Sequence, residues 1–283
     1  MKLILIIVFT VAISGLAAAC GGGGDGSESR KTVVASFYPL AFAAEQVGGT
    51  TVAVENLTPP GAEPHDLEVS PSDVSKIRSA DFVLLLGHGF QPQLEDAAGS
   101  GSNVVALLDT PSLDVHPDGD PHVWLDPLRY TKIVERVGAV LGRPAEAARL
   151  VGRLEELDKE YRRGLADCAR REIVTSHEAF AYLAERYGLR QIAITGLNPE
   201  AEATPQALQK TVDAVRASQA TTVYFERLVS PRLAETVARE TGTKTAVLDP
   251  IEGLTDMEKK EGADYFTLMR TNLHALRTGL GCR

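Results

Sequence analysis

The sequence has no block of basic residues. Its 29 lysines and arginines are outnumbered by 38 aspartates and glutamates, which gives a formal net charge of −9. A negative surface repels the phosphate backbone of nucleic acids, so we expect no nucleic-acid partner. Aromatic residues are also few, at 6%, but 44% of the 283 residues are hydrophobic. That balance is typical of a globular protein with one large domain or two modest ones.

Common catalytic and nucleotide-binding motifs are missing as well. The chain contains no P-loop, no GxGxxG after a strand, no GxSxG, no CxxC and no HExxH. We therefore expect a protein that is not an enzyme. A zinc hydrolase that uses Glu63 or Asp66 as its general base remains as an alternative.

A long apolar run occurs at the N-terminus, where LILIIVFTVAISGLAAA follows Lys2. It is short for a membrane-spanning helix and ends in small residues, so residues 1–19 are predicted to be an export signal peptide. The AAAC ending resembles the lipobox of bacterial lipoproteins, which implies lipidation of Cys20, although Leu16 lies one position earlier than in that pattern. Residues 20–30 are predicted to be a Gly/Ser-rich tether. We expect an extracytoplasmic protein anchored to the bacterial cell membrane through Cys20; simple secretion is the alternative.

Cysteine is scarce, with three residues in the whole chain. If Cys20 carries lipid, Cys168 and Cys282 remain as an even pair in an oxidising compartment. This count predicts a disulfide between them, with two unpaired buried thiols as the alternative.

Short β-branched runs alternate with helical stretches along the chain. Strands are predicted at 31–37, 51–57, 81–87, 103–109, 172–176, 190–194, 221–225 and 244–249. Helices are predicted at 39–47, 71–79, 178–187, 205–217 and 231–241, where apolar residues recur at three- and four-residue spacing. Four strands with crossover helices, twice over, predict an α/β fold with two lobes. Each lobe holds a four-stranded, mainly parallel sheet with flanking helices.

A strongly helical segment lies between the two halves, at residues 127–170, with a break at 142–144. Its second part, 144–168, is long and charged, and we interpret it as a rigid helix that joins the lobes rather than a surface helix of one lobe. The predicted organisation is an N-terminal lobe at 31–126, this helical linker at 127–170, and a C-terminal lobe at 171–283.

Three of the six histidines follow predicted strands. Ligand sites of open α/β sheets lie at the carboxyl ends of the strands. Together with Asp249 at the end of the strand predicted at 244–249, these histidines suggest a tetrahedral metal site with four ligands, namely His65, His122, His177 and Asp249; a structural role for each histidine taken alone is the alternative. Acidic neighbours are expected to orient the imidazoles, namely Glu63 and Asp66 beside His65, Asp120 beside His122, and Glu178 after His177. His88 and His116 have no assigned role, and His274 is expected on the surface.

Five ordered motifs carry a resemblance to a known family. PPGAEPHDLEVSPSDV, DPHVWLDP, TSHEAFAYLAERYGL, TGLNPEAEATPQAL and VLDPIEGL resemble motifs of the metal-specific solute-binding lipoproteins of bacterial ABC importers, in the zinc branch of cluster A-I. The resemblance begins near residue 31 and runs to the C-terminus. It implies two α/β lobes joined by a long helix, and it places the metal ligands at His65, His122, His177 and Asp249, with water as an alternative to the carboxylate.

The resemblance also implies a function. Histidine at the third ligand position is typical of zinc binders in the family, so His177 indicates one Zn²⁺, with Mn²⁺ or iron as the alternative. The loop at 109–120 is short and holds one histidine, whereas many zinc members have a long His-rich loop there. The implied role is capture of Zn²⁺ outside the membrane and its delivery to an ABC permease, by a protein that we expect to be monomeric. A surface adhesin is a further alternative.

Overall fold

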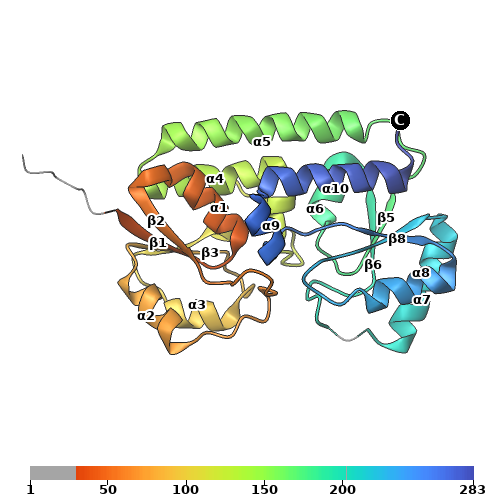
Figure 1. Ribbon diagram of the computed structural model, residues 1–283, viewed down its shortest axis with the longest axis horizontal. Helices are drawn as coiled ribbons and strands as arrows, with labels where there is room; N and C mark the ends of the chain where they lie inside the picture. Colours follow the sequence, from red (N-terminus) through yellow and green to blue (C-terminus); the bar gives the residue numbers. More distant parts are fainter. Residues whose placement is uncertain (1–29, 202) are drawn as a thin grey trace, which may run out of the picture.

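The structure, a computed structural model, describes residues 30–201 and 203–283, so the predicted signal peptide, Cys20 and most of the tether lie outside it. Two parallel sheets form the two lobes, with strand orders β2-β1-β3-β4 and β6-β5-β7-β8 (Figure 1). The predicted α/β fold with two lobes is confirmed. The first sheet comprises β1 (Lys31–Ala35), β2 (Val52–Asn56), β3 (Phe82–Leu85) and β4 (Val104–Ala106); the second comprises β5 (Glu172–Thr175), β6 (Arg190–Ala193), β7 (Thr222–Phe225) and β8 (Lys244–Val247).

Helices pack on both faces of the first sheet, with α1 on one side and α2 and α3 on the other (Figure 1). The first lobe contains α1 (Tyr38–Gly48), α2 (Pro71–Ser79) and α3 (Pro92–Ala98), with short 3-10 helices η1 (Gly49–Thr51), η2 (Leu107–Asp109) and η3 (Val123–Leu125). After the second sheet begins, the chain forms α6 (Ala181–Tyr187), α7 (Pro205–Ser218), α8 (Arg232–Thr241), α9 (Asp256–Glu261) and α10 (Tyr265–Leu280).

Local start signals set several of these boundaries. The Ser70 hydroxyl accepts a hydrogen bond from the backbone of Asp73, whose carboxylate in turn accepts from the backbone of Ser70, so α2 begins with a capping box. All eight strands are shorter than predicted, and two elements show the difference clearly. The strand predicted at 103–109 ends at Ala106, because Leu107–Asp109 turns into η2, and the helix predicted at 178–187 begins only at Ala181.

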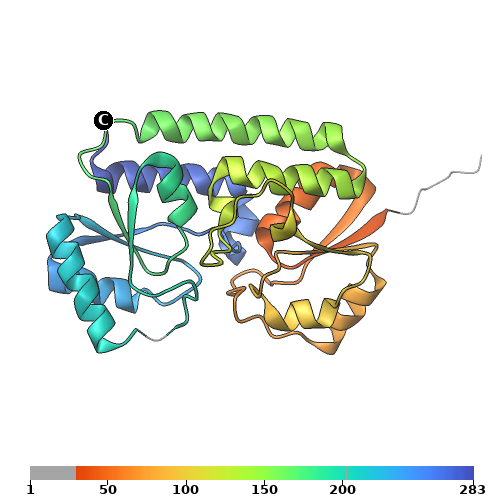
Figure 2. The same ribbon diagram turned by 180° about the vertical axis from the view of Figure 1, so that it is seen from behind.

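Two helices connect the lobes. α4 (Pro127–Leu141) is capped by Asp126 and ends at Gly142, whose φ of 70° needs the freedom of glycine. α5 (Pro144–Gly164) then runs back along both lobes (Figures 1 and 2). The predicted break and the predicted long connecting helix are therefore present.

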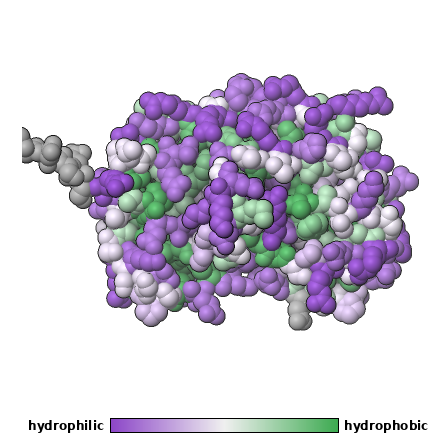
Figure 3. All heavy atoms as spheres, viewed as in Figure 1, coloured by the Kyte–Doolittle hydropathy of each residue, from purple (hydrophilic) through white to green (hydrophobic). Residues whose placement is uncertain are grey.

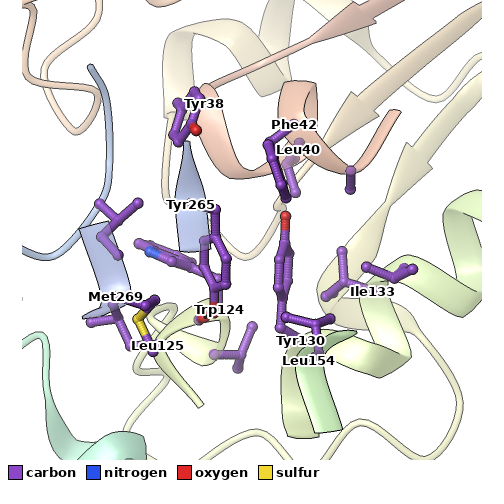
Figure 4. Packing of buried hydrophobic residues seen from close by; sticks show 14 of the residues in the cluster. Tyr38, Leu40, Phe42, Trp124, Leu125, Tyr130, Ile133, Leu154, Tyr265 and Met269 are labelled. Carbon is purple, nitrogen blue, oxygen red and sulfur yellow. Dashed lines mark hydrogen bonds between the residues drawn. The ribbon is translucent and has the colours of Figure 1, made fainter. Parts of the chain in front are cut away.

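One hydrophobic core extends through both lobes, because α10 packs beside α5 and α1. Tyr265 on α10 stacks on Phe42 of the first lobe, with ring centroids 5.7 Å apart, and its hydroxyl donates to the carbonyl of Trp124 (Figure 4). The hydroxyl of Tyr161 on α5 donates to the carbonyl of Met269 on α10. These buried tyrosines connect α5, the first lobe and the second lobe.

The predicted disulfide between Cys168 and Cys282 is present and links the C-terminus to the segment that follows α5. Within the described ranges no helix has both the length and the apolar character required to cross a bilayer. On the face drawn in Figure 3, hydrophobic residues form separate small patches among hydrophilic ones.

Candidate metal centre

Four side chains converge between the lobes: His65, His122, His177 and Glu252. One potential ligand atom from each lies within 4.8 Å of the others. The Nε2 atoms of His122 and His177 are 3.3 Å apart, and Glu252 Oε1 lies 3.3 Å from His65 Nε2, 3.2 Å from His122 Nε2 and 3.7 Å from His177 Nε2. The side chains of His122 and His177 are fully buried, whereas that of His65 is 8% exposed.

Asp120 holds the imidazole of His122. One carboxylate oxygen accepts from the backbone N–H of His122 at 2.9 Å and lies 2.7 Å from its Nδ1. A proton on Nδ1 leaves the lone pair of Nε2 for a metal, the usual arrangement for a ligating histidine. The Tyr182 hydroxyl of the second lobe donates to the carbonyl of Asp120, so the second lobe supports this pair. The expectation that Asp120 orients His122 agrees with this geometry.

Glu226 plays the same part for His177. His177 lies two residues after the end of β5, and its Nδ1 lies 2.6 Å from a carboxylate oxygen of Glu226, which directly follows β7. The Ser176 hydroxyl donates to that same oxygen. Glu178 was expected in this role, and the structure corrects it: Glu178 is exposed and makes no side-chain hydrogen bond to His177. The feature of the sequence that indicates Glu226 as the partner of His177 is its position at the carboxyl end of a neighbouring strand.

His65 has no carboxylate on its second ring nitrogen among the described residues. Its Nε2 faces Glu252, and its ring packs against Phe90, with centroids 4.6 Å apart. Glu63 was expected to hold this imidazole, but its carboxylate accepts from the backbone of Asp66 instead. Burial, with a smaller contribution from Glu252, raises the pKa of Glu63 to about 8. Asp66 itself is exposed, and its carboxylate makes no hydrogen bond with the ring in the described part of the chain.

Asp249 lies next to the cluster but outside it, which corrects the expected fourth donor. Its Oδ1 accepts from the backbone N–H of Ile251 at 2.7 Å, and its Oδ2 lies 3.6 Å from the guanidinium of Arg227. The chain turns sharply here, with φ of 59° at Ile251, and delivers Glu252 to the three imidazoles. Asp249 therefore stabilises the turn that presents Glu252.

The loop of His65 and the segment of Glu252 are joined directly. The backbone N–H of Gly61 donates to the carbonyl of Leu254 at 2.9 Å. A methyl group on Gly253 would approach the side chain of Leu228 to 3.3 Å and the carbonyl of Ala62 to 3.6 Å, so these loops pack closely. Two potential donors, one from each lobe, are thus carried by segments in mutual contact.

Hydrogen bonds between buried carboxylates and imidazoles shift the pKa values of His177 and Glu252. Burial alone would lower the pKa of His177, but hydrogen bonds with Glu226 and Glu252 raise it to about 10. Burial alone would raise the pKa of Glu252, but hydrogen bonds from the three imidazoles hold it well below its usual range. Three buried carboxylates, Asp120, Glu226 and Glu252, therefore face three imidazoles. A divalent cation that displaces the imidazole protons would balance the negative charge of these carboxylates.

The donor set and its spacing fit zinc. A tetrahedral zinc ion with metal–ligand distances of 2.0–2.1 Å places its donors about 3.3 Å apart. Four of the donor pairs measured here are separated by 3.2–3.7 Å. The Trp124 ring, 5.1 Å from that of His122, adds a buried apolar wall that strengthens electrostatic attraction.

Comparison with known proteins gives consistent matches. Residues 33–279 match the family model described as "Zinc-uptake complex component A periplasmic". The zinc-binding lipoprotein AdcA of Streptococcus pneumoniae is 34% identical over 281 residues, covering 89% of this chain and 56% of AdcA. The chain thus spans about half the length of that relative. The high-affinity zinc uptake system protein ZnuA of Bacillus subtilis is 31% identical over 300 residues, covering 94% of both chains.

Solved structures give the same result. The Zn(II)-bound ZnuA-like domain of Streptococcus pneumoniae AdcA superposes with a TM-score of 0.76 at 35% identity, covering 89% of this chain and 99% of that domain. The laminin-binding protein Lmb of Streptococcus agalactiae, described as a bifunctional protein with adhesin and metal transporting activity, has a TM-score of 0.80 at 29% identity. It covers 88% of this chain and 99% of Lmb.

Proposed function

Because the chain belongs to the family of zinc-uptake component A proteins, we propose that it is the extracytoplasmic zinc-binding component of an ABC metal importer. It captures Zn²⁺ between its lobes and delivers the ion to a membrane permease. The observation that carries this proposal is the cluster of three imidazoles and one carboxylate, whose potential ligand atoms lie within 4.8 Å of one another.

The proposed ligands of one Zn²⁺ are His65, His122, His177 and Glu252. All four come from the protein, so no position remains for the metal-bound water that a zinc hydrolase requires. Nitrogen donors outnumber the oxygen donor, which favours zinc over manganese or iron. We therefore propose transport without covalent chemistry.

The arrangement in the cell is part of the same proposal. Cys20 and the signal peptide lie outside the described residues, and we propose that Cys20 is lipidated and anchors a monomer on the outer face of the cell membrane. The relative AdcA is named a lipoprotein, which supports this placement. We propose functional boundaries of 31–126 for the first lobe, 127–170 for the linker and 171–283 for the second lobe.

Calorimetry on metal-stripped protein tests the choice of metal. We expect one equivalent of Zn²⁺ to bind far more tightly than Mn²⁺, and anomalous scattering at the zinc edge to give one peak among the four ligands. Tighter binding of Mn²⁺ would assign the chain to manganese or iron transport instead.

An adhesin role is a second candidate, supported by the similarity to Lmb. The test is binding to laminin by wild-type protein and by the His177→Ala variant. Laminin binding that survives the loss of the zinc site would establish an adhesive function beside metal capture; no binding in either protein excludes it.

A further inference from the structure

A pocket of about 330 Å³ opens to solvent beside the metal centre. Its walls include His65, Asp66, His88 and Phe90 from the first lobe and Asn198 from the second. Asp66, His88 and Asn198 are exposed, so the pocket reaches the surface. His65 is the most exposed of the four proposed ligands, and it lies on this wall. The pocket therefore brings solvent to one of the four proposed ligands, His65.

His88 has the hydrogen bonding of a metal-binding histidine. Its Nε2 lies 2.9 Å from a carboxylate oxygen of Asp109, and its other ring nitrogen has no hydrogen-bond partner among the described residues. His122 with Asp120 and His177 with Glu226 show the same pairing of one ring nitrogen with a carboxylate. Such a pairing fixes the tautomer and increases the basicity of the free nitrogen.

The backbone at His88 is conformationally costly. Gly87, His88 and Gly89 have φ values of 89°, 59° and 83°, and the N–H of Phe90 donates to the carbonyl of Gly87. Positive φ at both central residues is typical of a type I′ turn, where glycine or asparagine is preferred. Folding alone therefore does not call for histidine here. The same turn ends at Phe90, whose ring packs on His65.

His116 provides a contrast. Its Nε2 also faces a carboxylate, that of Glu185, at 3.1 Å. That carboxylate is shared with the guanidinium of Arg129, which lies over the ring of Tyr182 on which His116 stacks. A neighbouring cation repels a second one, so His116 is suited to holding the loop on α6. No lysine or arginine forms an ion pair with Asp109 in the described part of the chain.

We propose that His88, backed by Asp109 and assisted by the negative charge of Asp66, is a transient landing site for Zn²⁺ at the pocket mouth. The site binds the partly hydrated ion weakly and passes it to His65. This inference rests on the proposed zinc-binding function. Since the landing site is not part of the final coordination shell, it accelerates entry and exit equally and leaves the equilibrium affinity unchanged.

Stopped-flow mixing of the metal-stripped full chain with Zn²⁺ tests the landing site. The one tryptophan of the chain, Trp124, lies beside His122 and gives a fluorescence signal for arrival of the ion. We expect His88→Asn to lower kon and koff together by about 3- to 10-fold, at the low end of electrostatic focusing effects, with Kd changed less than about twofold. Asp109→Asn should act in the same direction more weakly.

Controls separate this inference from its premise. Asparagine tolerates positive φ, so His88→Asn is expected to fold with unchanged thermal stability. His274→Asn removes an exposed imidazole on α10 and should leave both rates unchanged. Rates of His88→Asn equal to wild type would overturn the landing site, as would a lower kon with unchanged koff. Absence of tight zinc binding by the wild-type chain would instead overturn the proposed function itself.

Discussion

The two sides of the metal centre are built differently. On the inner side, His122 and His177 are fully buried, and each has its Nδ1 held by a carboxylate, at 2.7 and 2.6 Å. On the outer side, His65 is partly exposed, lies on a loop and is held by ring packing against Phe90. The inner side therefore resembles a preorganised receptor, whereas the outer side combines access with weaker orientation. If the proposed zinc site is correct, this difference implies that the buried histidines mainly determine affinity and that His65 is the ligand nearest the entry route.

Single variants that remove a ligand on one side or the other should give the largest losses of zinc affinity. Four-ligand zinc sites bind with about 10–16 kcal/mol, so His177→Ala is expected to cost about 3 kcal/mol, a hundredfold or more in Kd. His65→Ala should cost several-fold less, because water can enter at the exposed position. Competition with a zinc chelator of known affinity measures both. Equal losses would remove the proposed difference between the sides.

The carboxylate donor gives the next effect. Glu252→Gln keeps the shape of the side chain but removes its charge, and we expect zinc affinity to fall by about a hundredfold. Asp249→Asn retains an oxygen that can accept from Ile251, so its effect on zinc affinity should stay under about tenfold. Calorimetry on the two variants decides between the two acids. A reversed order would restore Asp249 as the ligand.

The carboxylates behind the inner histidines should have a smaller effect. Glu226→Gln and Asp120→Asn each remove the charge that orients an imidazole, and outer partners of this kind are typically worth 10- to 100-fold in metal affinity. Glu178→Gln is the matched control, because Glu178 is exposed and does not contact His177. A full effect from Glu178→Gln would contradict the assignment of Glu226.

The pH should affect zinc affinity mainly through the inner side of the centre, at His177. With its pKa raised to about 10, His177 keeps a proton at neutral pH in the metal-free protein, and zinc must displace it. Zinc affinity should therefore strengthen by up to about tenfold per pH unit as pH rises from about 6.5 to 10.

The stability of the metal-free fold should change with pH in the opposite direction. A raised pKa contributes stability that is complete below about 6.5 and lost as pH rises through about 10. Thermal melts of stripped protein across this window measure the trend, and Glu226→Gln should flatten it. A stability that rises with pH through the same window would show that His177 is neutral in the stripped protein.

The three histidines could be predicted from the sequence because each follows a predicted strand, and parallel strands bring their carboxyl ends to one edge. Glu252 was not identified, since the position of that side chain depends on a turn at Ile251 with positive φ, which local residue preferences do not reveal. Glu226 was detectable in principle, because it follows β7 as His177 follows β5. The sharing of one core by both lobes was also beyond the sequence, since α10 reaches the first lobe through tertiary packing alone.

The contact between the His65 loop and the Glu252 segment, through Gly61 and Leu254, has a consequence in coordination chemistry. A chelate holds its metal strongly because the ligands dissociate one at a time, and a dissociated ligand rebinds before the next one dissociates. Two donors on joined loops leave together when either loop is displaced. In the proposed zinc site, a single displacement of these two contacting loops would therefore leave only His122 and His177 on the ion, while α5 and the shared core stay in place.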